Sequence, residues 1–300
     1  MNKEFLDLAE QLKSSVSCTV RLNELMSGHT SFKIGGPADI LVLPESIEQL
    51  REVLKVVKET VVPLTLLGNG SNVLVRDKGI RGIVIKLGNM LRHFYEAEDL
   101  LVFGSGYSLA LASYKAMECG KTGMEFAVGI PGSIGGAVYM NAGAYDGEMQ
   151  NIVNCVKVMD LQGNERVLTA EELNFGYRKT SLQNSGLIVT EVTLKMPSGN
   201  KDEIKSKMDD FSHRRISKQP LEMPSAGSMF KRPPGYFAGT LIDQAGLKGY
   251  TVGGAQISTK HAGFVVNVGG ATAADVLQLI KDVQTKIKAG VGVELQPEVL

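Results

Sequence analysis

The sequence predicts an α+β protein of two or three domains, and three observations support this fold class. The chain has 300 residues, which is too long for one typical hydrophobic core and suits several domains. Apolar residues make up 43% of the chain and charged residues 21%, as in ordinary globular proteins. Short apolar segments typical of strands alternate with amphipathic stretches of helical period.

The first domain is expected over residues 1–88, as a small lobe that contains a β-α-β unit. Apolar residues recur at helical spacing over residues 3–14 and again after Ser46, so both stretches predict helices. Ser46 and Gln49 have the spacing of a capping box at the start of the second helix. Strands are expected at residues 39–43, 64–67, 73–75 and 83–85.

The second domain is expected over residues 89–200. Ser108 can cap a helix that continues through Cys119, and Gly120 is placed to end it. Thr169 with Glu172 forms another capping-box pattern. Strands are expected at residues 101–103, 153–159 and 188–196.

The third domain is expected over residues 201–290, after a polar boundary at residues 198–202. Its first helix should turn Ile204, Met208 and Phe211 inward, because these residues lie at helical spacing. Further elements are expected as a helix at 236–245, a strand at 262–268, a helix capped by Thr272, and a terminal strand at 291–300 that can return to the first domain.

Charge and cysteine content exclude several classes of function. Lys+Arg and Asp+Glu number 32 each, so the net charge indicates neither a nucleic-acid partner nor an acidic membrane as partner. The three cysteines, Cys18, Cys119 and Cys155, form no CxxC pair, so no metal site and no disulfide framework is expected. Charged residues near the start exclude a secretory signal, and no apolar run has the length of a membrane span. We therefore expect a cytoplasmic protein.

The first of two glycine clusters follows the strand at 64–67. It consists of Gly68, Asn69, Gly70, Ser71 and Asn72. It resembles the GxGxxG dinucleotide fingerprint but lacks the last glycine and the helix that should follow, so a Rossmann site is not expected. Such a turn can still present backbone N–H groups to a pyrophosphate. A hairpin turn rich in bulges explains this cluster equally well.

The second cluster lies between apolar segments of the second domain. Its members are Gly129, Ile130, Pro131, Gly132, Ser133, Gly135 and Gly136. Backbone without side chains in two separate domains suits a long, flat, phosphorylated ligand between them. A flavin dinucleotide fits that description better than a mononucleotide.

Six motifs in a fixed order carry a family resemblance. They are residues 29–38, 68–72, 129–136, 176–178, 226–231 and 295–299. With these motifs the sequence resembles the UDP-N-acetylenolpyruvoylglucosamine reductase family, from about Val20 to the last residue. Each motif is weak by itself, whereas six with matching spacing are a strong signal.

The resemblance implies a two-lobed FAD-binding fold of the vanillyl-alcohol-oxidase type and a C-terminal α+β substrate-binding domain. FAD would be bound noncovalently, by the two glycine clusters and by Asn141, Gly143, Ala144 and Ile188. NADPH would reduce the flavin and leave, and the nucleotide sugar would then take a hydride to give UDP-N-acetylmuramate for peptidoglycan. The segment 179–187 is short and contains no tyrosine, as in the shorter subtype of the family. A monomer or weak homo-oligomer is expected.

The chemistry of an enolpyruvyl ether assigns three catalytic candidates. Hydride addition to its methylene carbon builds negative charge beside the carboxylate, which needs hydrogen bonds or a cation and then a proton. The planar fork of Arg178 suits the carboxylate, and by resemblance a protonated Glu298 lies on its other side. Ser228 would donate the proton. Taken singly, they also fit a surface arginine, a solvated carboxylate and a turn serine.

Further residues are candidates for the nucleotide sugar. Arg215 and Lys218 lie about one helical turn apart and should share a face toward the diphosphate. Lys218 also matches a phosphate ligand of the family. By sequence position and resemblance, the remaining substrate candidates are Tyr177, Gly227, Arg232 and His261.

Two other functions remain open on the sequence. One is a different flavoenzyme of the same cofactor fold, such as a sugar or alcohol oxidase. The other is a nucleotide-binding protein without catalytic activity, which would contain no yellow flavin. A visible spectrum distinguishes a flavoenzyme from the inactive nucleotide-binding protein. Oxidation of NADPH that depends on the enolpyruvyl substrate distinguishes the reductase from both alternatives.

Overall fold

A computed structural model describes residues 3–88 and 90–300 of the chain, which forms two compact units. Unit 1 consists of Met1–Leu22, Asp39–Asn69 and Gly82–Arg214. Unit 2 consists of Asn23–Ala38, Gly70–Arg81 and Arg215–Leu300. The boundaries expected near residues 88, 200 and 290 stay a prediction.

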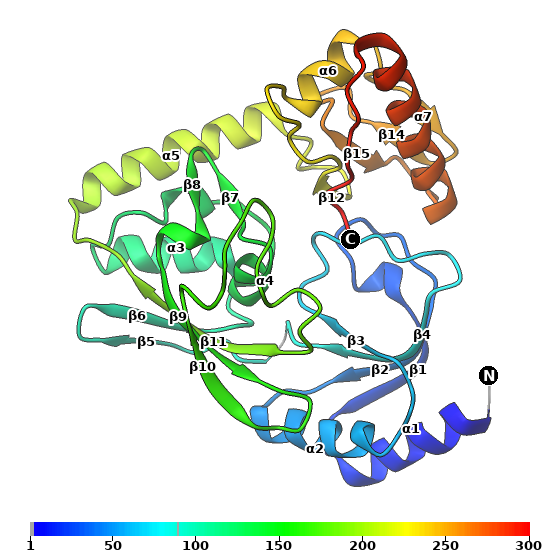
Figure 1. Ribbon diagram of the computed structural model, residues 1–300, viewed down its shortest axis with the longest axis vertical. Helices are drawn as coiled ribbons and strands as arrows, with labels where there is room; N and C mark the ends of the chain where they lie inside the picture. The colour runs from blue at the N-terminus through cyan, green and yellow to red at the C-terminus, as the bar shows by residue number, and fades with distance from the viewer. Residues whose placement is uncertain (1–2, 89) are drawn as a thin grey trace. The chain divides into compact units, whose positions relative to one another are not determined.

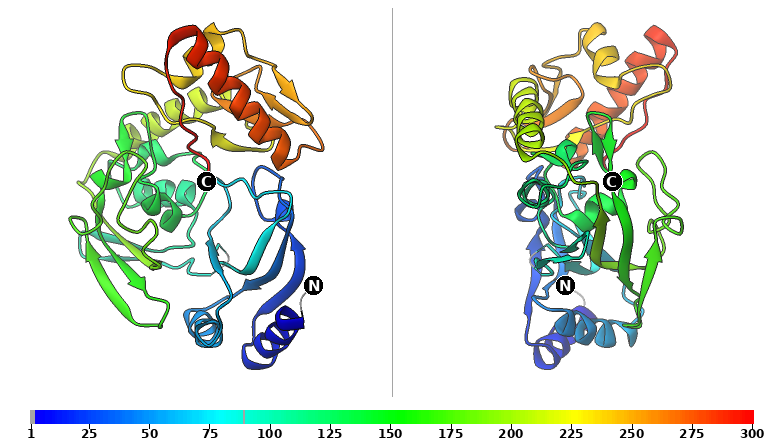
Figure 2. Two further views of the ribbon diagram at one scale, coloured as in Figure 1. Left: turned by 45° about the vertical axis from the view of Figure 1, so that its right-hand side comes forward. Right: turned by 90° about the vertical axis from the view of Figure 1, so that its left-hand side faces the viewer.

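The first sheet has the strand order β1-β2-β4-β3, and β3 pairs with β4 in parallel. Helices α1 and α2 lie together against one face of it (Figures 1 and 2). Leu12, Leu50 and Ile85 are fully buried in the core between them. Ser46 accepts a hydrogen bond from Gln49 N and starts α2 as expected. The elements are α1 (Lys3–Ser15), β1 (Thr19–Leu25), β2 (Pro37–Leu43), α2 (Ile47–Lys58), β3 (Leu64–Leu67) and β4 (Ile80–Lys86).

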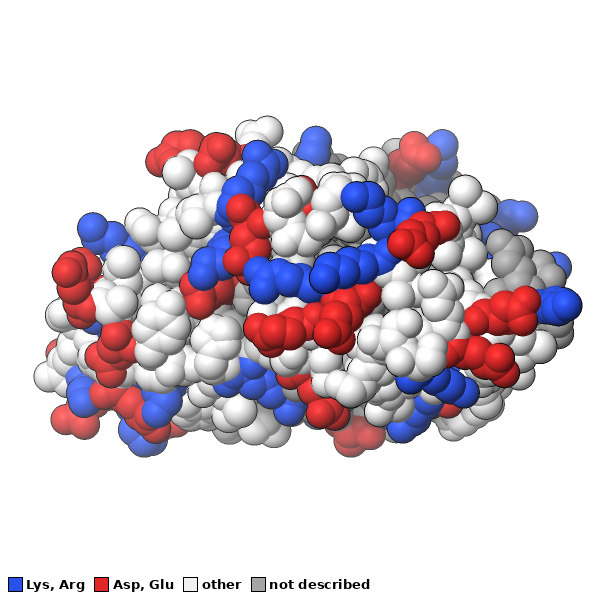
Figure 3. All heavy atoms as spheres, turned by 90° about the horizontal axis from the view of Figure 1, so that it is seen from below, with Lys and Arg blue, Asp and Glu red and all other residues white. Residues whose placement is uncertain are grey.

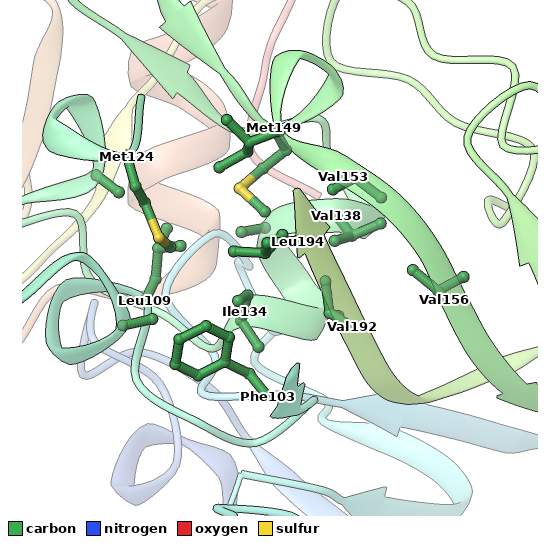
Figure 4. Close-up of a cluster of buried hydrophobic side chains, with 14 of the residues drawn as sticks. Phe103, Leu109, Met124, Ile134, Val138, Met149, Val153, Val156, Val192 and Leu194 are labelled. Atoms are coloured by element: carbon green, nitrogen blue, oxygen red, sulfur yellow. The ribbon is translucent and has the colours of Figure 1, made fainter. Parts of the chain in front are cut away.

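The second sheet, in unit 1, has the antiparallel order β10-β9-β11-β6-β5. Figure 4 shows its core, where Phe103, Ile134 and Val192 are fully buried between the sheet and the helices α3 and α4. Ser108 caps α3 as expected. The elements are β5 (Phe94–Ala97), β6 (Leu100–Gly104), α3 (Leu109–Glu118), α4 (Ile134–Tyr139), the hairpin β7 (Gly143–Ala144) and β8 (Gly147–Glu148), β9 (Val153–Met159), β10 (Glu165–Thr169) and β11 (Ile188–Lys195).

The third sheet, in unit 2, has the order β12-β15-β14-β13 and is covered by α6 and α7. Thr272 and Asp275 form a capping box at the start of α7. Helix α5 runs from unit 1 into unit 2, and its Ile204, Met208 and Phe211 are buried as predicted. The elements are α5 (Lys201–Lys218), β12 (Ser225–Ser228), α6 (Ala238–Gln244), β13 (Thr251–Val252), β14 (Ala255–Ile257), β15 (Phe264–Asn267) and α7 (Ala273–Val291).

Two predicted strands are wrong, for a shared reason. Residues 73–75 and 292–300 contain no strand in the structure. Instead, Leu74 N donates to Leu300 O at 2.8 Å and Leu300 N donates to Asn72 O at 3.1 Å. The two segments thus bond to each other through these backbone groups and do not join a sheet. Pro297 has no N–H for a ladder and forms only an isolated bridge with Phe230.

The second predicted capping box forms without a helix. Thr169 N donates to Glu172 Oε2 at 2.8 Å, and Glu172 N donates to Thr169 Oγ1 at 3.4 Å. The following residues form turns, and Ser181 N then donates to Leu173 O. The motif therefore closes a turn here, because the capping pattern fixes only its own first turn.

Charged side chains of both signs lie interspersed on the face that Figure 3 shows. This distribution accords with a formal net charge of zero. In the described ranges, no helix combines the length and the apolar character needed to cross a membrane.

Candidate active site

The two glycine clusters approach each other within unit 1. A Cβ placed on Gly68 would lie 3.2 Å from Ser133 Oγ, so the end of β3 lies against the start of α4. A Cβ on Gly135 would lie 2.7 Å from Ser105 Cβ. Glycine is therefore required at Gly135, where any side chain would collide with the neighbouring turn. Gly68 and Ser133 are thus neighbours in unit 1, and the ligand expected between the two clusters stays a prediction.

Several backbone donors of these clusters have no protein acceptor in the described part of the chain. They are the N–H groups of Gly68, Asn69, Gly129, Gly132 and Ser133. Backbone N–H groups that a protein leaves unpaired commonly serve a ligand, and successive ones form anion-binding nests.

Other donors of the second cluster are used by the protein itself. Ile134 N donates to Tyr107 O and Gly135 N to Ser105 O, both at 2.9 Å. Gly136 N donates to Ser133 Oγ. The cluster therefore divides into residues that build the turn and residues that can hold phosphate oxygens, and this set fits the pyrophosphate of a dinucleotide.

Arg178 lies on a tight turn in unit 1. Gly176 and Lys179 exchange two backbone hydrogen bonds across it, and Arg178 has a positive φ of 55°. Its Nη1 donates to Asn141 O at 3.3 Å, and its Nη2 donates to Gly143 O at 3.1 Å. The guanidinium also lies 5.2 Å from the centre of the Tyr177 ring. Left-handed backbone at a non-glycine residue is typical of functional sites.

Asn141 organises this part of unit 1. Its side chain is fully buried, and its Nδ2 donates to Gly176 O at 3.0 Å. Its Oδ1 accepts a hydrogen bond from Gln150 N at 3.0 Å. The structure thus brings together five predicted site residues: Asn141, Gly143, Ala144, Tyr177 and Arg178. Because protein partners occupy the Asn141 amide, a contact between that side chain and the cofactor stays a prediction.

Ile188 begins β11, and its side chain is 1% exposed in the core beside the first sheet. Only the backbone of Ile188 could therefore contact a ligand. Its contact with the cofactor stays a prediction.

Ser228 and Glu298 lie on neighbouring segments of unit 2. Ser228 ends β12 and is exposed, after Gly227 with a φ of 78°. Glu298 N donates to Met229 O at 2.9 Å, one residue beyond Ser228. Lys231 N donates to Gln296 O at 2.8 Å. The two catalytic candidates are thus adjacent, although 70 positions separate them in the sequence.

The second half of the first glycine cluster is fastened to the same segments of unit 2. Ser31 N donates to Gly70 O at 3.0 Å, and Ser31 Oγ donates to Ser225 O at 2.7 Å. Asn72 Nδ2 donates to Glu298 O at 3.4 Å. Sequence reasoning did not single out Ser31 as a site residue, although it lies in the quoted motif 29–38.

The predicted substrate residues of unit 2 differ in exposure. Arg215 is 7% exposed and donates from Nη1 to Gln219 Oε1, whereas Lys218 is exposed. Of the two residues expected to share a face toward the diphosphate, Arg215 is thus buried and Lys218 is exposed, and their contact with the diphosphate stays a prediction. Arg232 stacks its guanidinium over the Phe237 ring at 4.0 Å.

His261 lies close to the end of α5. Burial lowers the pKa of His261, and the positive charges of Lys248 and Lys218 lower it further. Its Nδ1 accepts a hydrogen bond from Gly263 N at 3.1 Å, so Nε2 carries the proton of the neutral ring. Lys260 Nζ donates to Ile216 O at 2.8 Å and joins this loop to α5. The loop that carries His261 and the end of α5 that carries Lys218 are therefore neighbours.

Two observations concern metals and thiols. Among residues 3–88 and 90–300, no group of His, Cys, Asp and Glu side chains is arranged to hold a metal ion. Burial and the Glu96 carboxylate raise the pKa of Cys119 to about 11, so its reactive thiolate form is scarce at neutral pH.

Comparison with known proteins agrees with this geometry. The family model for the C-terminal domain of UDP-N-acetylenolpyruvoylglucosamine reductase matches residues 219–300, and an FAD binding domain matches residues 38–169. A UDP-N-acetylenolpyruvoylglucosamine reductase from Clostridioides difficile is 49% identical over 93% of this chain and 92% of its own length. One from Clostridium perfringens is 50% identical over 99% and 96%.

This chain belongs to the UDP-N-acetylenolpyruvoylglucosamine reductase family. The crystal structure of a family member from Thermus caldophilus has a TM-score of 0.79 and 38% identity, covering 94% of this chain and 98% of that one. Family membership confirms the predicted two-lobed FAD-binding fold with a C-terminal domain, FAD as the cofactor, and an oxidoreductase activity.

Proposed function

We propose that this chain reduces UDP-N-acetylenolpyruvoylglucosamine to UDP-N-acetylmuramate for peptidoglycan synthesis, in the cytoplasm and with NADPH as reductant. The names of its relatives, each about 50% identical, support the substrate. Bound FAD would supply the hydride-transfer chemistry between the reductant and the enol ether. The other steps depend on this chain's own residues, and we expect it to act as a monomer or weak homo-oligomer.

Backbone donors hold the cofactor in this proposal. The N–H groups of Gly68, Asn69, Gly129, Gly132 and Ser133 would hold its phosphates, because the described part of the protein provides them with no acceptor. Gly135 and Gly136 build the turn behind them. A dinucleotide is favoured because the donors come from two separate loops that meet at Gly68 and Ser133.

Arg178 stabilises the anion that forms when hydride adds to the enol ether. The negative charge develops on the carboxylate of the substrate as an enediolate. A guanidinium carries five N–H donors in one plane, so one edge can hold backbone carbonyls while another pairs with a carboxylate. The bonds to Asn141 O and Gly143 O fix the group in advance, and a donor that is already in place costs no reorganisation during the reaction.

Ser228 completes the reaction by donating a proton to the α carbon. A serine hydroxyl is a weak acid, so only a strongly basic carbon can take its proton, and the enediolate is such a base. The family resemblance assigns Glu298 a hydrogen bond to the substrate. The observation that carries the proposal is the hydrogen bond from Glu298 N to Met229 O, which places both residues on adjoining backbone.

Lys218 and His261 bind the diphosphate of the nucleotide. The hydrogen bond from Lys260 Nζ to Ile216 O joins the loop of His261 to the end of α5, which carries Lys218. A neutral His261 donates from Nε2 while Lys218 supplies the charge. Arg232, exposed and stacked on Phe237, adds a second cation from the loop after Ser228.

Ser228→Ala tests the function with the two half-reactions measured separately. Flavin reduction by NADPH should be unchanged, while reoxidation by the enolpyruvyl substrate should slow about 10²- to 10⁴-fold, the usual effect of a general acid. Ser225→Ala on the same strand is the matched control and should leave both rates intact. Equal slowing of both half-reactions in Ser228→Ala would exclude the serine as the proton donor.

A further inference from the structure

An aromatic residue occupies a strained turn beside the Arg178 site. Tyr145 and Asp146 form the two-residue turn of the β7–β8 hairpin, with φ of 50° and 62°. Such turns favour Asn and Gly, because a side chain in left-handed backbone meets steric hindrance. A tyrosine at this position suggests that its side chain makes a compensating contact.

That contact is with helix α5. The Tyr145 ring stacks on the Phe211 ring with centres 4.4 Å apart and planes 11° from parallel. Its hydroxyl donates to Phe211 O at 3.3 Å. Phe211 is 8% exposed in a cluster with Val128, the residue before Gly129. Figure 1 shows α5 passing over the hairpin, so the tyrosine joins the hairpin to the helix.

The other end of the hairpin holds Arg178. Gly143 O, two residues before Tyr145, accepts the hydrogen bond from Arg178 Nη2. Asn141 Nδ2 donates to Glu148 Oε2 at 3.0 Å across the base of the hairpin. The hairpin is therefore short and closed, with α5 bound at its tip and the guanidinium bound at its base.

We propose that Tyr145 is a positioning residue, which fastens the β7–β8 hairpin to α5 and thereby holds Arg178 for the substrate carboxylate. The inference rests on the proposed role of Arg178. Two-stranded hairpins of this length are not stable alone, so the hairpin needs the helix as a support. Without that support the Gly143 carbonyl moves, and Arg178 loses a fixed acceptor.

The test removes the ring and keeps the turn. Tyr145→Asn suits the purpose, because asparagine tolerates left-handed backbone. In the FAD-bound enzyme, with flavin reduced by dithionite, reoxidation by the enolpyruvyl substrate should slow about 10- to 100-fold, since a misplacement near 1 Å can cost 10²-fold. Tyr145→Phe keeps the stacked ring and should stay within about threefold of the parent.

A second readout does not depend on activity. Amide hydrogen exchange in residues 201–214 and in the hairpin should be faster in Tyr145→Asn and near the parental rate in Tyr145→Phe. Asp146→Gly is the control at the neighbouring turn position, because it relieves the same strain and keeps the ring contact. It should change neither exchange nor reoxidation. Phe211→Leu removes the partner ring instead and should reproduce the slow reoxidation of Tyr145→Asn.

Combination with Arg178→Lys separates the inference from the proposed function. If Tyr145 acts through Arg178, Tyr145→Asn should cause little further slowing in the Arg178→Lys background. A full additional loss there, or normal reoxidation in Tyr145→Asn alone, overturns the positioning role. If Arg178→Lys itself leaves reoxidation unchanged, the proposed role of Arg178 is wrong and the role of Tyr145 is wrong with it.

Discussion

Replacement of Asn141 by alanine should destabilise unit 1 and disturb Arg178 together. The change removes the Oδ1 acceptor of Gln150 N and the Nδ2 donor to Gly176 O. The Glu148 carboxylate also loses its bond from Nδ2 but keeps the one from Gln150 Nε2. It also puts alanine at a φ of 43°, where a residue other than Gly, Asn or Asp is strained. The backbone carbonyl that holds Arg178 Nη1 belongs to the same residue.

The expected loss follows from these three effects. Gln150 is exposed, so water can partly replace the lost acceptor at a cost of about 1 kcal/mol. Gly176 O keeps its bond from Lys179 N, which again limits the cost to about 1 kcal/mol. The left-handed backbone adds about 1 kcal/mol. The total is about 3 kcal/mol.

Asn174→Ala is the matched control. Asn174 also has a positive φ, 44°, but it is exposed, so only the backbone cost of about 1 kcal/mol applies. Urea unfolding of both variants measures the difference, which should be about 2 kcal/mol. Native-state hydrogen exchange at Gln150 N and Lys179 N locates it, because a chain of two units need not unfold in one step. Equal destabilisation of the two variants would refute the reasoning.

Two further predictions concern unit 2. Glu298→Gln keeps a hydrogen-bonding side chain and should impair substrate-dependent turnover less than Glu298→Ala; equal loss of steady-state rate in both contradicts the hydrogen-bonding role. The lowered pKa of His261 means that, as the pH falls below about 6.5, the unfolded chain takes up a proton that the folded chain resists, so stability falls. His261→Gln should make the fall in unfolding free energy between pH 7 and 5 shallower, by at most about 1.4 kcal/mol per pH unit. The substitution His213→Gln, at an exposed histidine, is the control. Identical pH dependence of the unfolding free energy in the parent and both variants would argue against a lowered pKa of His261.

Local sequence patterns correctly predicted features that depend on contacts within one helix, such as its buried face and its N-terminal cap. The stripe of Ile204, Met208 and Phe211 predicted the buried face of α5, because helical spacing alone places these side chains on one side. Ser46, Ser108 and Thr272 marked helix starts, since a capping bond spans only three residues. The ordered motifs also determined the family, the FAD-binding fold and the class of reaction.

Tertiary contacts decided what the patterns left open. Residues 73–75 have the composition of a strand, but Leu74 found its partner at Leu300, 226 positions away. Arg215 and Lys218 share helical spacing, but only packing determined that Arg215 is buried.

The sequence by itself determined the family, the cofactor fold and the helices, because those depend on local periodicity and on ordered motifs. Only the tertiary structure could place Glu298 beside Ser228, fasten Arg178 to Asn141 and Gly143, and stack Tyr145 on Phe211. These contacts join residues that are distant in the chain. They form because backbone N–H and C=O groups that are buried by packing need hydrogen-bond partners. A local sequence pattern cannot predict which distant residue supplies the partner.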